Sequence, residues 1–384
     1  MAQALTRPED RSRILVVNAG SSSLKLRLLD GNDAVLEEAD LGAVGGSADA
    51  AQVADAVSAW GAAPGAVGHR VVHGGTRYTA ATLLTDASIA EIRALGALAP
   101  LHQPKSLAAI DAVRAVLPGV PHVACFDTAF HATLPAAAST YALPAEWRDR
   151  WRLRRYGFHG LSHAYASRRV AELAGHGDDP SFRVITCHLG AGASLAAVLG
   201  GRSVDTTMGF TPLEGLVMAT RSGDVDPGLV LWLARDAGLP LDELADGLEH
   251  RSGLVGLGGS DDMRAILSGA AAGSEPERVA LDVYLHRLRA GIAAMAASLG
   301  GMHALVFTGG VGERSAPVRA LASDGLGFLG VAVDPAANDA ASRDGDHEIT
   351  GASDGDRTPG VRTWVIEARE DVEIARQVRG VVSD

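Results

Sequence analysis

The first group of residues that could do chemistry lies between two apolar runs near the N-terminus. Residues 18–25 read Asn-Ala-Gly-Ser-Ser-Ser-Leu-Lys and follow the apolar run 14–17. Gly20 lets the backbone come close to an anion, main-chain N–H groups and serine hydroxyls can donate hydrogen bonds, and Lys25 adds a positive charge. The P-loop pattern is absent, and the segment after the turn alternates like a strand. The segment is therefore typical of a phosphate-binding turn, although a Gly-Ser turn taken alone is more often a plain hairpin.

Two further glycine-rich segments follow strand-like runs later in the chain. Residues 188–194 read His-Leu-Gly-Ala-Gly-Ala-Ser, and residues 308–313 read Thr-Gly-Gly-Val-Gly-Glu. The turns around Gly20 and Gly190 each lie between the first two strands of a three-strand unit. This match indicates two related halves, with chance similarity of two hairpins as the alternative. Together the turns suggest a nucleotide held across a cleft, with its phosphates on two turns and its base near the third.

The elements that must position these turns alternate between strands and helices. Strands are expected within 14–40, with a hairpin at 30–32, and over 66–72 and 122–126, and helices over 52–60, 88–98, 104–117 and 371–382. Asp86 can cap the second helix, and the last helix has an apolar face that includes Val378 and Val382. Such alternation favours a largely parallel sheet, which binds ligands at the carboxyl ends of its strands. Arg70 and Asp127 lie at such ends.

The composition excludes several classes of protein. The 384 residues favour two domains, and 47% hydrophobic with 21% charged residues indicates a globular chain. A net charge of −12 argues against a nucleic-acid or acidic-membrane partner, so an anionic substrate must meet local positive charge. Cys125 and Cys187 end apolar runs and are expected to be buried thiols of a cytoplasmic protein. No secretion signal is evident, and the uncharged run 290–312 is better explained by a helix, a turn, a strand and a glycine loop than by a membrane span.

The motifs together resemble the acetokinase family, whose members share the fold of actin, sugar kinases and Hsp70-like ATPases. The resemblance runs from Ile14 to about Arg379. The run Met-Gly-Phe-Thr-Pro-Leu-Glu-Gly at 208–215, followed by Thr-Arg-Ser-Gly-Asp at 220–224, is highly specific. The other matching segments are 18–25, 69–75, 126–131, 156–160, 188–194, 205–227, 262–264 and 310–313.

The resemblance implies both a fold and an activity. The fold is α/β, with two duplicated actin-like (ribonuclease H-like) domains and a nucleotide cleft between them. Residues 12–135, completed by the C-terminal helix 371–384, would form the N-terminal domain, and 136–370 the nucleotide-binding C-terminal domain. The activity is that of an acetate kinase: reversible, Mg²⁺-dependent, direct in-line transfer of the ATP γ-phosphoryl group to acetate, giving acetyl phosphate and ADP. Mn²⁺ could replace Mg²⁺, and the resemblance further implies a cytoplasmic homodimer.

The resemblance assigns the catalytic residues. Phosphoryl transfer depends mostly on positioning and charge stabilisation, so Arg70 and Arg221 are expected to hold the carboxylate and to meet the equatorial phosphoryl oxygens. His159, in Tyr-Gly-Phe-His-Gly, is expected to donate a hydrogen bond to the moving phosphoryl group. Asp127 matches a position that the family labels catalytic, but a carboxylate substrate is already ionised near neutral pH. Asp127 is therefore expected to orient a metal-bound water or an arginine rather than to act as a base.

The remaining site residues follow from the resemblance alone. Val72, Leu101, Phe158 and Pro212 would contact the methyl end of the substrate. Mg²⁺ would be held by Asn18 and Glu370, with a solvated helix N-terminus as the alternative interpretation of Glu370. The nucleotide would contact Ser21, Ser23, Lys25, His188, Leu189, Gly190, Ala191, Gly192, Asp262, Met263, Arg264, Gly310, Val311, Gly312, Glu313 and Arg314.

The chain departs from the family pattern at a few positions and leaves rival functions open. The family usually has Asn where Ala191 and Arg314 stand, and Thr-Asn where residues 368–369 read Ala-Arg. Ala191 removes a hydrogen bond near the phosphates, so nucleotide affinity and preference are expected to differ. The nearest rival is the same chemistry on propionate or butyrate, because one methylene changes binding only modestly. A non-catalytic nucleotide switch of the actin or Hsp70 kind is the rival from another class, and a sugar kinase would instead use an Asp base and polar pocket residues.

Overall fold

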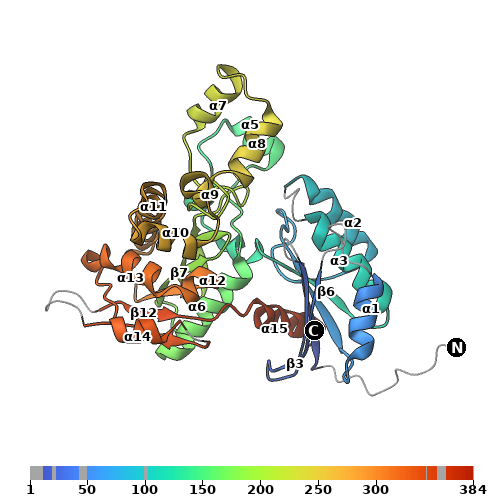
Figure 1. Ribbon diagram of the computed structural model, residues 1–384. Helices are drawn as coiled ribbons and strands as arrows, with labels where there is room; N and C mark the ends of the chain where they lie inside the picture. Colours follow the sequence, from blue (N-terminus) through green and yellow to red (C-terminus); the bar gives the residue numbers. More distant parts are fainter. Residues whose placement is uncertain are drawn as a thin grey trace. The chain divides into compact units, whose positions relative to one another are not determined.

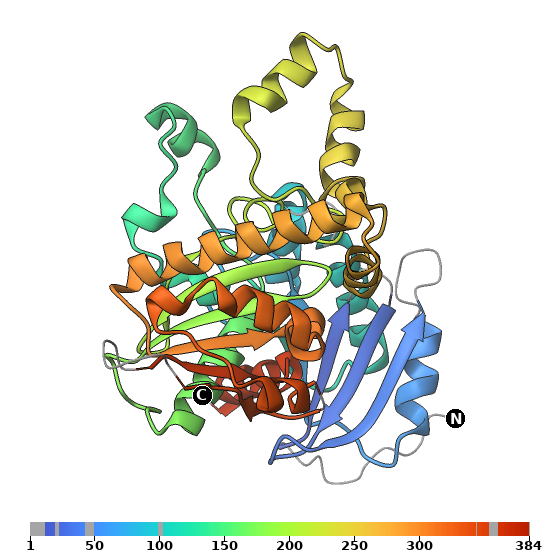
Figure 2. The same ribbon diagram turned by 60° about the vertical axis from the view of Figure 1, so that its left-hand side comes forward.

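The computed structural model describes residues 12–19, 23–42, 50–98, 103–342, 344–352 and 360–383 (Figures 1 and 2). The chain divides into two units, which are considered separately below. Unit 1 comprises the chain up to Ala132, residues 160–165 and the chain from Arg369 onward. Unit 2 comprises Thr133–His159 and Ala166–Ala368. Residues 160–165 fall in unit 1, where Gly160 N donates to Asp127 O at 2.9 Å, whereas the expected domain boundary put them in the C-terminal domain.

Unit 1 is built on a six-stranded sheet in the order β3-β2-β1-β4-β6-β5. The pairs β1–β4 and β4–β6 are parallel, and the other pairs are antiparallel. The central strands are almost continuous apolar runs, as expected for strands covered on both faces. The strands are β1 (Ile14–Ala19), β2 (Ser23–Leu29), β3 (Val35–Gly42), β4 (Ala66–Val71), β5 (Thr82–Leu83) and β6 (His122–Phe126).

Helices cover both faces of the unit 1 sheet. Figure 1 shows α1 and α3 on one face and α15 on the other. On the first face, Val53 of α1 and Val113 of α3 belong to a buried cluster with Leu15 of β1. On the other face, Ile374 and other apolar residues of α15 are buried. The helices and 3₁₀ turns are α1 (Ala50–Ala59), α2 (Asp86–Ala94), η1 (Leu95–Leu98), α3 (Gln103–Val116), η2 (Ala129–Thr133) and α15 (Glu370–Ser383).

Unit 2 is built on a second six-stranded sheet, in the order β9-β8-β7-β10-β12-β11. The pairs β7–β10 and β10–β12 are parallel, and the others are antiparallel. Strand order and strand direction therefore match those of unit 1, which confirms two similar α/β halves. The strands are β7 (Arg183–Leu189), β8 (Ala193–Leu199), β9 (Arg202–Thr206), β10 (Ala304–Thr308), β11 (His347–Glu348) and β12 (Arg362–Val365).

The helices of unit 2 include one of 25 residues, α11 (Glu275–Leu299), which buries one face through residues such as Leu285, Leu288 and Ile292. Figure 2 shows it crossing the strands of the second sheet. α6 (Gly160–Ala174) begins in unit 1 and continues in unit 2. The other elements are α4 (Ala136–Ser139), α5 (Ala145–Trp151), α7 (Pro227–Arg235), α8 (Leu241–His250), α9 (Gly253–Gly258), α10 (Met263–Ala271), α12 (Gly309–Arg314), α13 (Ala316–Asp324), η3 (Gly327–Leu329) and α14 (Pro335–Ala340).

Some expectations about local structure are wrong. The sheets are mixed rather than largely parallel, because each Gly turn joins an antiparallel pair at one side. Thr85, not Asp86, caps α2, since its side chain and that of Ser88 form a capping box. The third glycine segment is the first turn of α12 rather than a loop, and Gly309 supplies its positive φ of 78°. The predicted apolar face of the last helix is in keeping with the structure, where Val378 is fully buried and Val382 half-buried.

The predictions that both cysteines are buried and that the uncharged run 290–312 contains the end of a helix and a strand are confirmed for the described residues. Cys125 and Cys187 are buried, unpaired thiols, and burial raises the pKa of each. The uncharged run resolves into the end of α11, the strand β10 and part of α12. Among the described helices, none combines the length and apolarity needed to cross a bilayer.

The packing of α15 against β4 predicts a stability effect at Gly68. A Cβ at this position would lie 2.4 Å from Ile374 Cγ2 and 2.7 Å from Val378 Cγ2, so Gly68→Ala must displace these side chains or the helix that carries them. We expect a loss of about 1–3 kcal/mol in the free energy of unfolding, measured by urea denaturation with circular dichroism. Gly119→Ala is the matched control, because nothing lies within 4 Å of its added Cβ. Equal stability of the two variants would contradict direct packing of α15 on β4.

Candidate functional site

Polar side chains of unit 1 meet at the carboxyl ends of its central strands. Asn18 lies near the end of β1, Arg70 near the end of β4, and Asp127 directly follows β6. Because β1, β4 and β6 run parallel, their ends lie at one edge of the sheet. Glu370, the first residue of α15, joins them through a hydrogen bond from Asn18. The structure thus brings together four predicted site residues of this unit, namely Asn18, Arg70, Asp127 and Glu370.

The ion pair between Arg70 and Asp127 is the centre of this group. Arg70 Nε donates to Asp127 Oδ1 at 3.2 Å and Oδ2 at 3.1 Å, and its Nη2 donates to Oδ2 at 2.7 Å. The Asp127 side chain is 2% exposed and that of Arg70 is 18% exposed. Burial raises the pKa of the Asp127 carboxyl, and the Arg70 guanidinium counteracts this rise. Burial would lower the pKa of Arg70, but Asp127 and Glu370 outweigh it and the pKa is raised.

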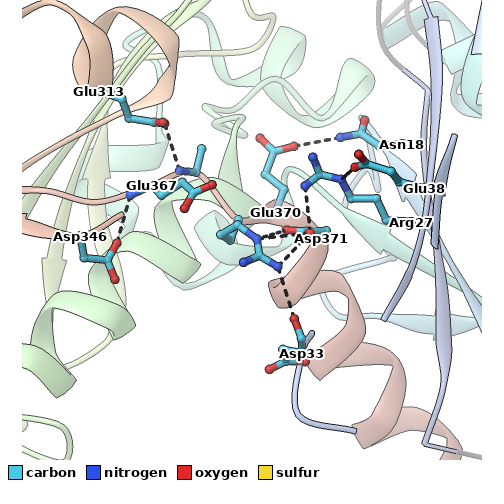
Figure 3. A network of polar contacts seen from close by, with 11 residues as sticks. Asn18, Arg27, Asp33, Glu38, Glu313, Asp346, Glu367, Glu370 and Asp371 are labelled. Atoms are coloured by element: carbon cyan, nitrogen blue, oxygen red, sulfur yellow. Dashed lines mark hydrogen bonds and ion pairs between the residues drawn. The ribbon is translucent and has the colours of Figure 1, made fainter. Parts of the chain in front are cut away.

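Asn18 links the ion pair to Glu370. Its Oδ1 accepts from Arg70 Nη1 at 3.2 Å, and its Nδ2 donates to Glu370 Oε2 at 3.2 Å (Figure 3). Glu370 Oε2 is also 3.9 Å from Arg70 Nε. The two predicted metal ligands are therefore neighbours, and one is an amide and the other a carboxylate.

The residues beside Glu370 anchor the start of α15 to the hairpin between β2 and β3 (Figure 3). Arg369 Nε donates to Asp371 Oδ1 at 3.0 Å, and Arg369 Nη2 donates to Asp33 O at 3.4 Å. Asp371 Oδ2 accepts from Arg27 Nη1 at 3.1 Å. Arg369, where the family pattern has Asn, thus holds the helical turn that carries Glu370.

The turn between β7 and β8 gathers predicted residues of unit 2. Gly190 N donates to Gly192 O at 3.0 Å and closes the turn. The His159 ring lies beside this turn, with its centroid 4.3 Å from that of His188. His159 Nδ1 is 2.9 Å from the hydroxyl of Ser194, which lies in β8. His159 has φ 56°, a left-handed conformation that is uncommon outside glycine and that clusters at functional sites.

Two nitrogen donors of unit 2 lie close to Gly192. A Cβ at this residue would lie 2.7 Å from Arg221 Nη2 and 3.3 Å from His159 Nε2. Any other residue would therefore displace one of these side chains. The structure brings together the two residues of unit 2 that were predicted to contact the phosphoryl group.

Arg221 is held by neutral groups of its own loop. Its Nη1 donates to Pro212 O at 2.7 Å, and burial lowers its pKa, with Glu249 opposing. Two residues before it, Ala219 N donates to the carbonyl of Ala191 in the β7–β8 turn at 3.1 Å. The loop that carries Arg221 is thus attached to the predicted phosphate-binding turn.

The residues predicted to contact the methyl group fall into different environments. Val72 and Phe158 are buried, at 6% and 1% exposure, and Pro212 is half-buried. Leu101 lies outside the described residues, as does Ser21 of the first glycine turn. Within that turn region, Lys25 is exposed on β2. Nothing is described for the side chain of Ser23, although its backbone opens β2.

The residues predicted to contact the nucleoside start two helices. Asp262 caps α10 by accepting from Arg264 N, and the two side chains form an ion pair of 2.8 Å on the surface. These hydrogen bonds from Arg264 lower the pKa of Asp262. Met263, the first residue of α10, is buried. A Cβ added at Gly310 would meet nothing within 4 Å outside the backbone of its own helix.

The turn into α12 is held from both ends by charged side chains. Glu313 Oε1 accepts from Gly309 N at 2.8 Å and from Ala368 N at 3.0 Å (Figure 3), and burial raises its pKa. Arg319, which is fully buried, donates to Gly312 O at 2.9 Å and to Glu313 O at 2.7 Å. Val311 and Arg314 lie within the helix so anchored. Glu313 therefore shapes the predicted nucleotide turn through internal contacts.

Sequence reasoning missed several residues of these groups. Ser194 lies inside the segment 188–194 that resembles the family. A hydroxyl among apolar strand residues usually has a hydrogen-bond partner, and this was the signal that could have identified it. Arg319 and Glu249 carry no local motif, since their contacts come from the tertiary fold. Two surface hollows, of about 690 Å³ in unit 1 and about 540 Å³ in unit 2, contain none of the predicted site residues among their lining.

Known proteins resemble this chain over most of its length. The model of the acetokinase family matches residues 54–376. An acetate kinase from Leifsonia xyli is 47% identical over 401 residues, covering 97% of this chain and 99% of the relative, and one from Gloeobacter violaceus is 52% identical over 313 residues, covering 81% and 75%.

Solved structures extend the comparison to the fold. The crystal structure of Porphyromonas gingivalis acetate kinase aligns with a TM-score of 0.87 at 34% identity, covering 97% of this chain and 100% of that one. A propionate kinase from Francisella tularensis aligns with a TM-score of 0.86 at 32% identity, covering 96% and 100%. From its motifs, its twin sheets and these alignments, the chain belongs to the acetokinase family.

Proposed function

We infer that this protein catalyses the reversible transfer of the ATP γ-phosphoryl group to acetate, giving acetyl phosphate and ADP. Membership in the acetokinase family supports a phosphotransferase with a carboxyl acceptor. The observation that carries the mechanism is that Arg221 Nη2 and His159 Nε2 both lie close to Gly192 in the β7–β8 turn. Two nitrogen donors close together beside a glycine turn suit a phosphoryl group whose equatorial oxygens carry the charge.

The carboxylate is assigned to Arg70. Asp127 accepts hydrogen bonds from Nε and from one N–H of Nη2 of Arg70, and Asn18 accepts one from Nη1. Each terminal nitrogen of Arg70 therefore has one further N–H that can donate to a substrate. The guanidinium plane is fixed by the bidentate pair, which limits the entropy lost when acetate binds. Asp127 is thus an orienting group for an arginine, and the ionised carboxylate needs no base.

The phosphoryl group is assigned to Arg221 and His159. Pro212 O fixes Arg221 without neutralising it, so its full charge can meet the negative charge of the transition state. We assign the Ser194 hydroxyl as donor to His159 Nδ1, which leaves the proton on Nε2 and makes this nitrogen the donor toward the phosphoryl oxygens. The backbone of the β7–β8 turn, from His188 to Gly192, would contact the phosphates.

The two residues predicted to hold the metal, Asn18 and Glu370, carry groups that suit Mg²⁺. Asn18 and Glu370 are neighbours, and each carries a side-chain oxygen, the ligand type that Mg²⁺ prefers. Asn18 Nδ2 faces Glu370 and Asn18 Oδ1 accepts from Arg70, so the amide would have to turn to present its oxygen beside the carboxylate. Mg²⁺ needs only one or two protein groups beside phosphate and water. When bound, Mg²⁺ would neutralise charge on the nucleotide phosphates. Arg369 and Asp371 hold the turn that presents Glu370. We place the enzyme in the cytoplasm, in keeping with its two unpaired thiols.

A hydroxamate assay across acids of increasing chain length tests the function. We expect acyl phosphate from acetate, with lower kcat/KM for propionate and butyrate, because the buried side chains of Val72 and Phe158 would limit the room for a longer acid. A preference for propionate would assign the enzyme to the longer acid. Slow ATP hydrolysis without any acyl phosphate would instead support a nucleotide switch.

Removing Arg221 is expected to abolish most of the rate. Arg221→Ala should lower kcat by about 10³ or more, as for other arginines that act in phosphoryl transfer. Steady-state hydroxamate kinetics measure the loss, and Arg202→Ala, an exposed arginine of β9, is the control. A loss below about tenfold in a folded variant would remove Arg221 from the mechanism.

The pH dependence separates a base from an orienting group at position 127. Asp127→Asn should lower kcat/KM for acetate by about 10- to 100-fold, since Arg70 loses a charged partner. The shape of the pH–rate profile over about pH 6 to 9 should not change. Were Asp127 a base, wild-type activity would fall as the pH drops through its raised pKa, because the protonated carboxyl cannot accept a proton. Such a limb in the wild type, lost in the Asn variant, would establish Asp127 as the base.

We also propose a homodimer formed through α7 of unit 2. None of the residues of this helix is buried, although it carries Leu229, Leu231 and Trp232 at 46%, 53% and 54% exposure. Leu241, at the start of the neighbouring α8, is 74% exposed. Exposed apolar side chains gathered in this way are typical of protein interfaces.

Charge on this helix is expected to break the dimer. Leu231→Asp should elute as a monomer, whereas Leu321→Asp, at a residue of α13 that is 38% exposed, should remain a dimer. Light scattering coupled to size-exclusion chromatography measures both masses. A monomeric wild type, or a dimeric Leu231→Asp variant, would refute this interface.

A further inference from the structure

A polar cluster of unit 2 stands outside every predicted site residue. Tyr141 follows α4, Arg155 precedes the Tyr-Gly-Phe-His segment, and Glu214 belongs to the Met-Gly-Phe-Thr-Pro-Leu-Glu-Gly motif. The Tyr141 hydroxyl donates to Glu214 Oε2, and Arg155 Nη2 donates to Glu214 Oε1. One carboxylate therefore joins two side chains that lie 73 and 59 residues away in the sequence.

The same cluster holds the backbone of the motif. Arg155 Nη1 donates to Thr207 O at 2.9 Å and to Met208 O at 3.2 Å, and the Tyr141 hydroxyl accepts from Phe210 N at 2.8 Å. In each of these hydrogen bonds the partner is a main-chain atom of residues 207–210. The cluster therefore holds the backbone of the loop in place. The loop is tied on both sides of residue 209.

Gly209 shows how closely the cluster approaches the loop. A Cβ here would lie 2.2 Å from the Tyr141 hydroxyl and 2.6 Å from Glu214 Cδ. The Gly209 carbonyl accepts from Tyr156 N at 3.0 Å and from Gly157 N at 3.2 Å, directly before Phe158 and His159. The cluster therefore joins the segment that carries His159 to the loop that carries Pro212.

The loop in turn orients Arg221. Pro212 lies between Phe210 and Glu214, which the cluster ties, and its carbonyl accepts from Arg221 Nη1 at 2.7 Å. The far side of the loop is closed by Asp224, whose N donates to Gly215 O at 2.9 Å and whose Oδ1 accepts from Gly215 N at 2.8 Å. A displaced Pro212 carbonyl would therefore displace the guanidinium.

We propose that Tyr141, Arg155 and Glu214 are positioning residues for phosphoryl transfer, which set the orientation of Arg221 and His159 through the loop of residues 207–215. This inference rests on the proposed function and names residues that act on its reaction without touching the substrate. Misplacement of a catalytic group by about 1 Å can cost about 100-fold in rate, so loss of the cluster is expected to lower kcat strongly. Its effect falls on the transition state, because Arg221 and His159 are assigned to the phosphoryl group in flight.

Variants of the cluster test the proposal. Tyr141→Phe removes the hydroxyl that joins Glu214 to Phe210 N and should lower kcat by about tenfold. Glu214→Ala should lower kcat by about 100-fold. Glu214→Gln should recover kcat to within about fivefold of the wild type, since its amide can accept from Arg155 and donate to the Tyr141 oxygen. Tyr284→Phe is the matched control, because the Tyr284 hydroxyl is buried without a partner among the described residues.

Binding of a transition-state mimic separates positioning from mere stability. Affinities are measured by calorimetry for ADP with magnesium, and for ADP with magnesium, acetate and aluminium fluoride, which mimics the planar phosphoryl group. Tyr141→Phe should weaken the mimic by about tenfold while the affinity for ADP stays within about twofold. A variant that is only less stable, and is assayed well below its melting temperature, would bind both ADP and the transition-state mimic as tightly as the wild type does.

The outcomes distinguish failure of the positioning role from failure of the proposed function. Loss of kcat and of mimic affinity in Tyr141→Phe and Glu214→Ala, with recovery in Glu214→Gln, supports the positioning role. Kinetics of Tyr141→Phe equal to those of Tyr284→Phe, or an equal loss of ADP and mimic affinity, overturns it while the proposed function stands. A wild-type protein that forms no acyl hydroxamate overturns the proposed function and this inference with it.

Discussion

Repulsion between anions is the constraint that the structure must meet. The proposed reaction brings a carboxylate against a nucleotide phosphate, in a protein whose net charge is −12. Cations must therefore be local, and they must be oriented before the substrates bind if they are to lower the barrier. The two arginines are oriented by different means. Arg70 is held by the carboxylate of Asp127, whereas Arg221 is held by the carbonyl of Pro212.

This difference suits the two tasks. A guanidinium paired with a carboxylate keeps its direction but presents a reduced field, which is enough to bind an anion that already exists. A guanidinium held by a neutral carbonyl, and largely removed from water, presents its whole charge to the charge that develops during transfer. Under the proposed mechanism, the partner of each arginine would separate ground-state binding by Arg70 from transition-state stabilisation by Arg221.

Much of the framework could be predicted because it depends on local pattern. Apolar runs on either side of glycine predicted the β1–β2 and β7–β8 hairpins, and strand ends predicted that Arg70 and Asp127 would meet. The edge strand β5 is two residues long and carries no periodic signal. The cap of α2 was misplaced because Thr85 and Asp86 are adjacent and both residue types cap helices, so only the Thr85–Ser88 spacing separates them.

The supporting contacts could not be predicted, because they join residues that are remote in the sequence. Glu214 lies inside a motif, but its partners are 73 and 59 residues away and carry no motif of their own. Arg319 lies in a helix where an arginine would ordinarily face solvent, and only the fold shows that it is buried against carbonyls of α12. The burial and the hydrogen-bond partners of such charged residues depend on tertiary packing, which a local sequence pattern does not reveal.

The repeated strand order has a consequence for how this protein can diverge. The turn between β1 and β2 and the turn between β7 and β8 occupy the same topological position in their sheets. Ancestrally equivalent positions need not stay equivalent, because one copy can lose a polar side chain while its counterpart keeps a full set. The second turn has the apolar Ala191 between its two glycines, whereas the first has an amide, hydroxyls and a lysine. A turn that binds an anion through main-chain N–H groups tolerates such differences in its side chains, so one topological position can carry two different sets of side chains.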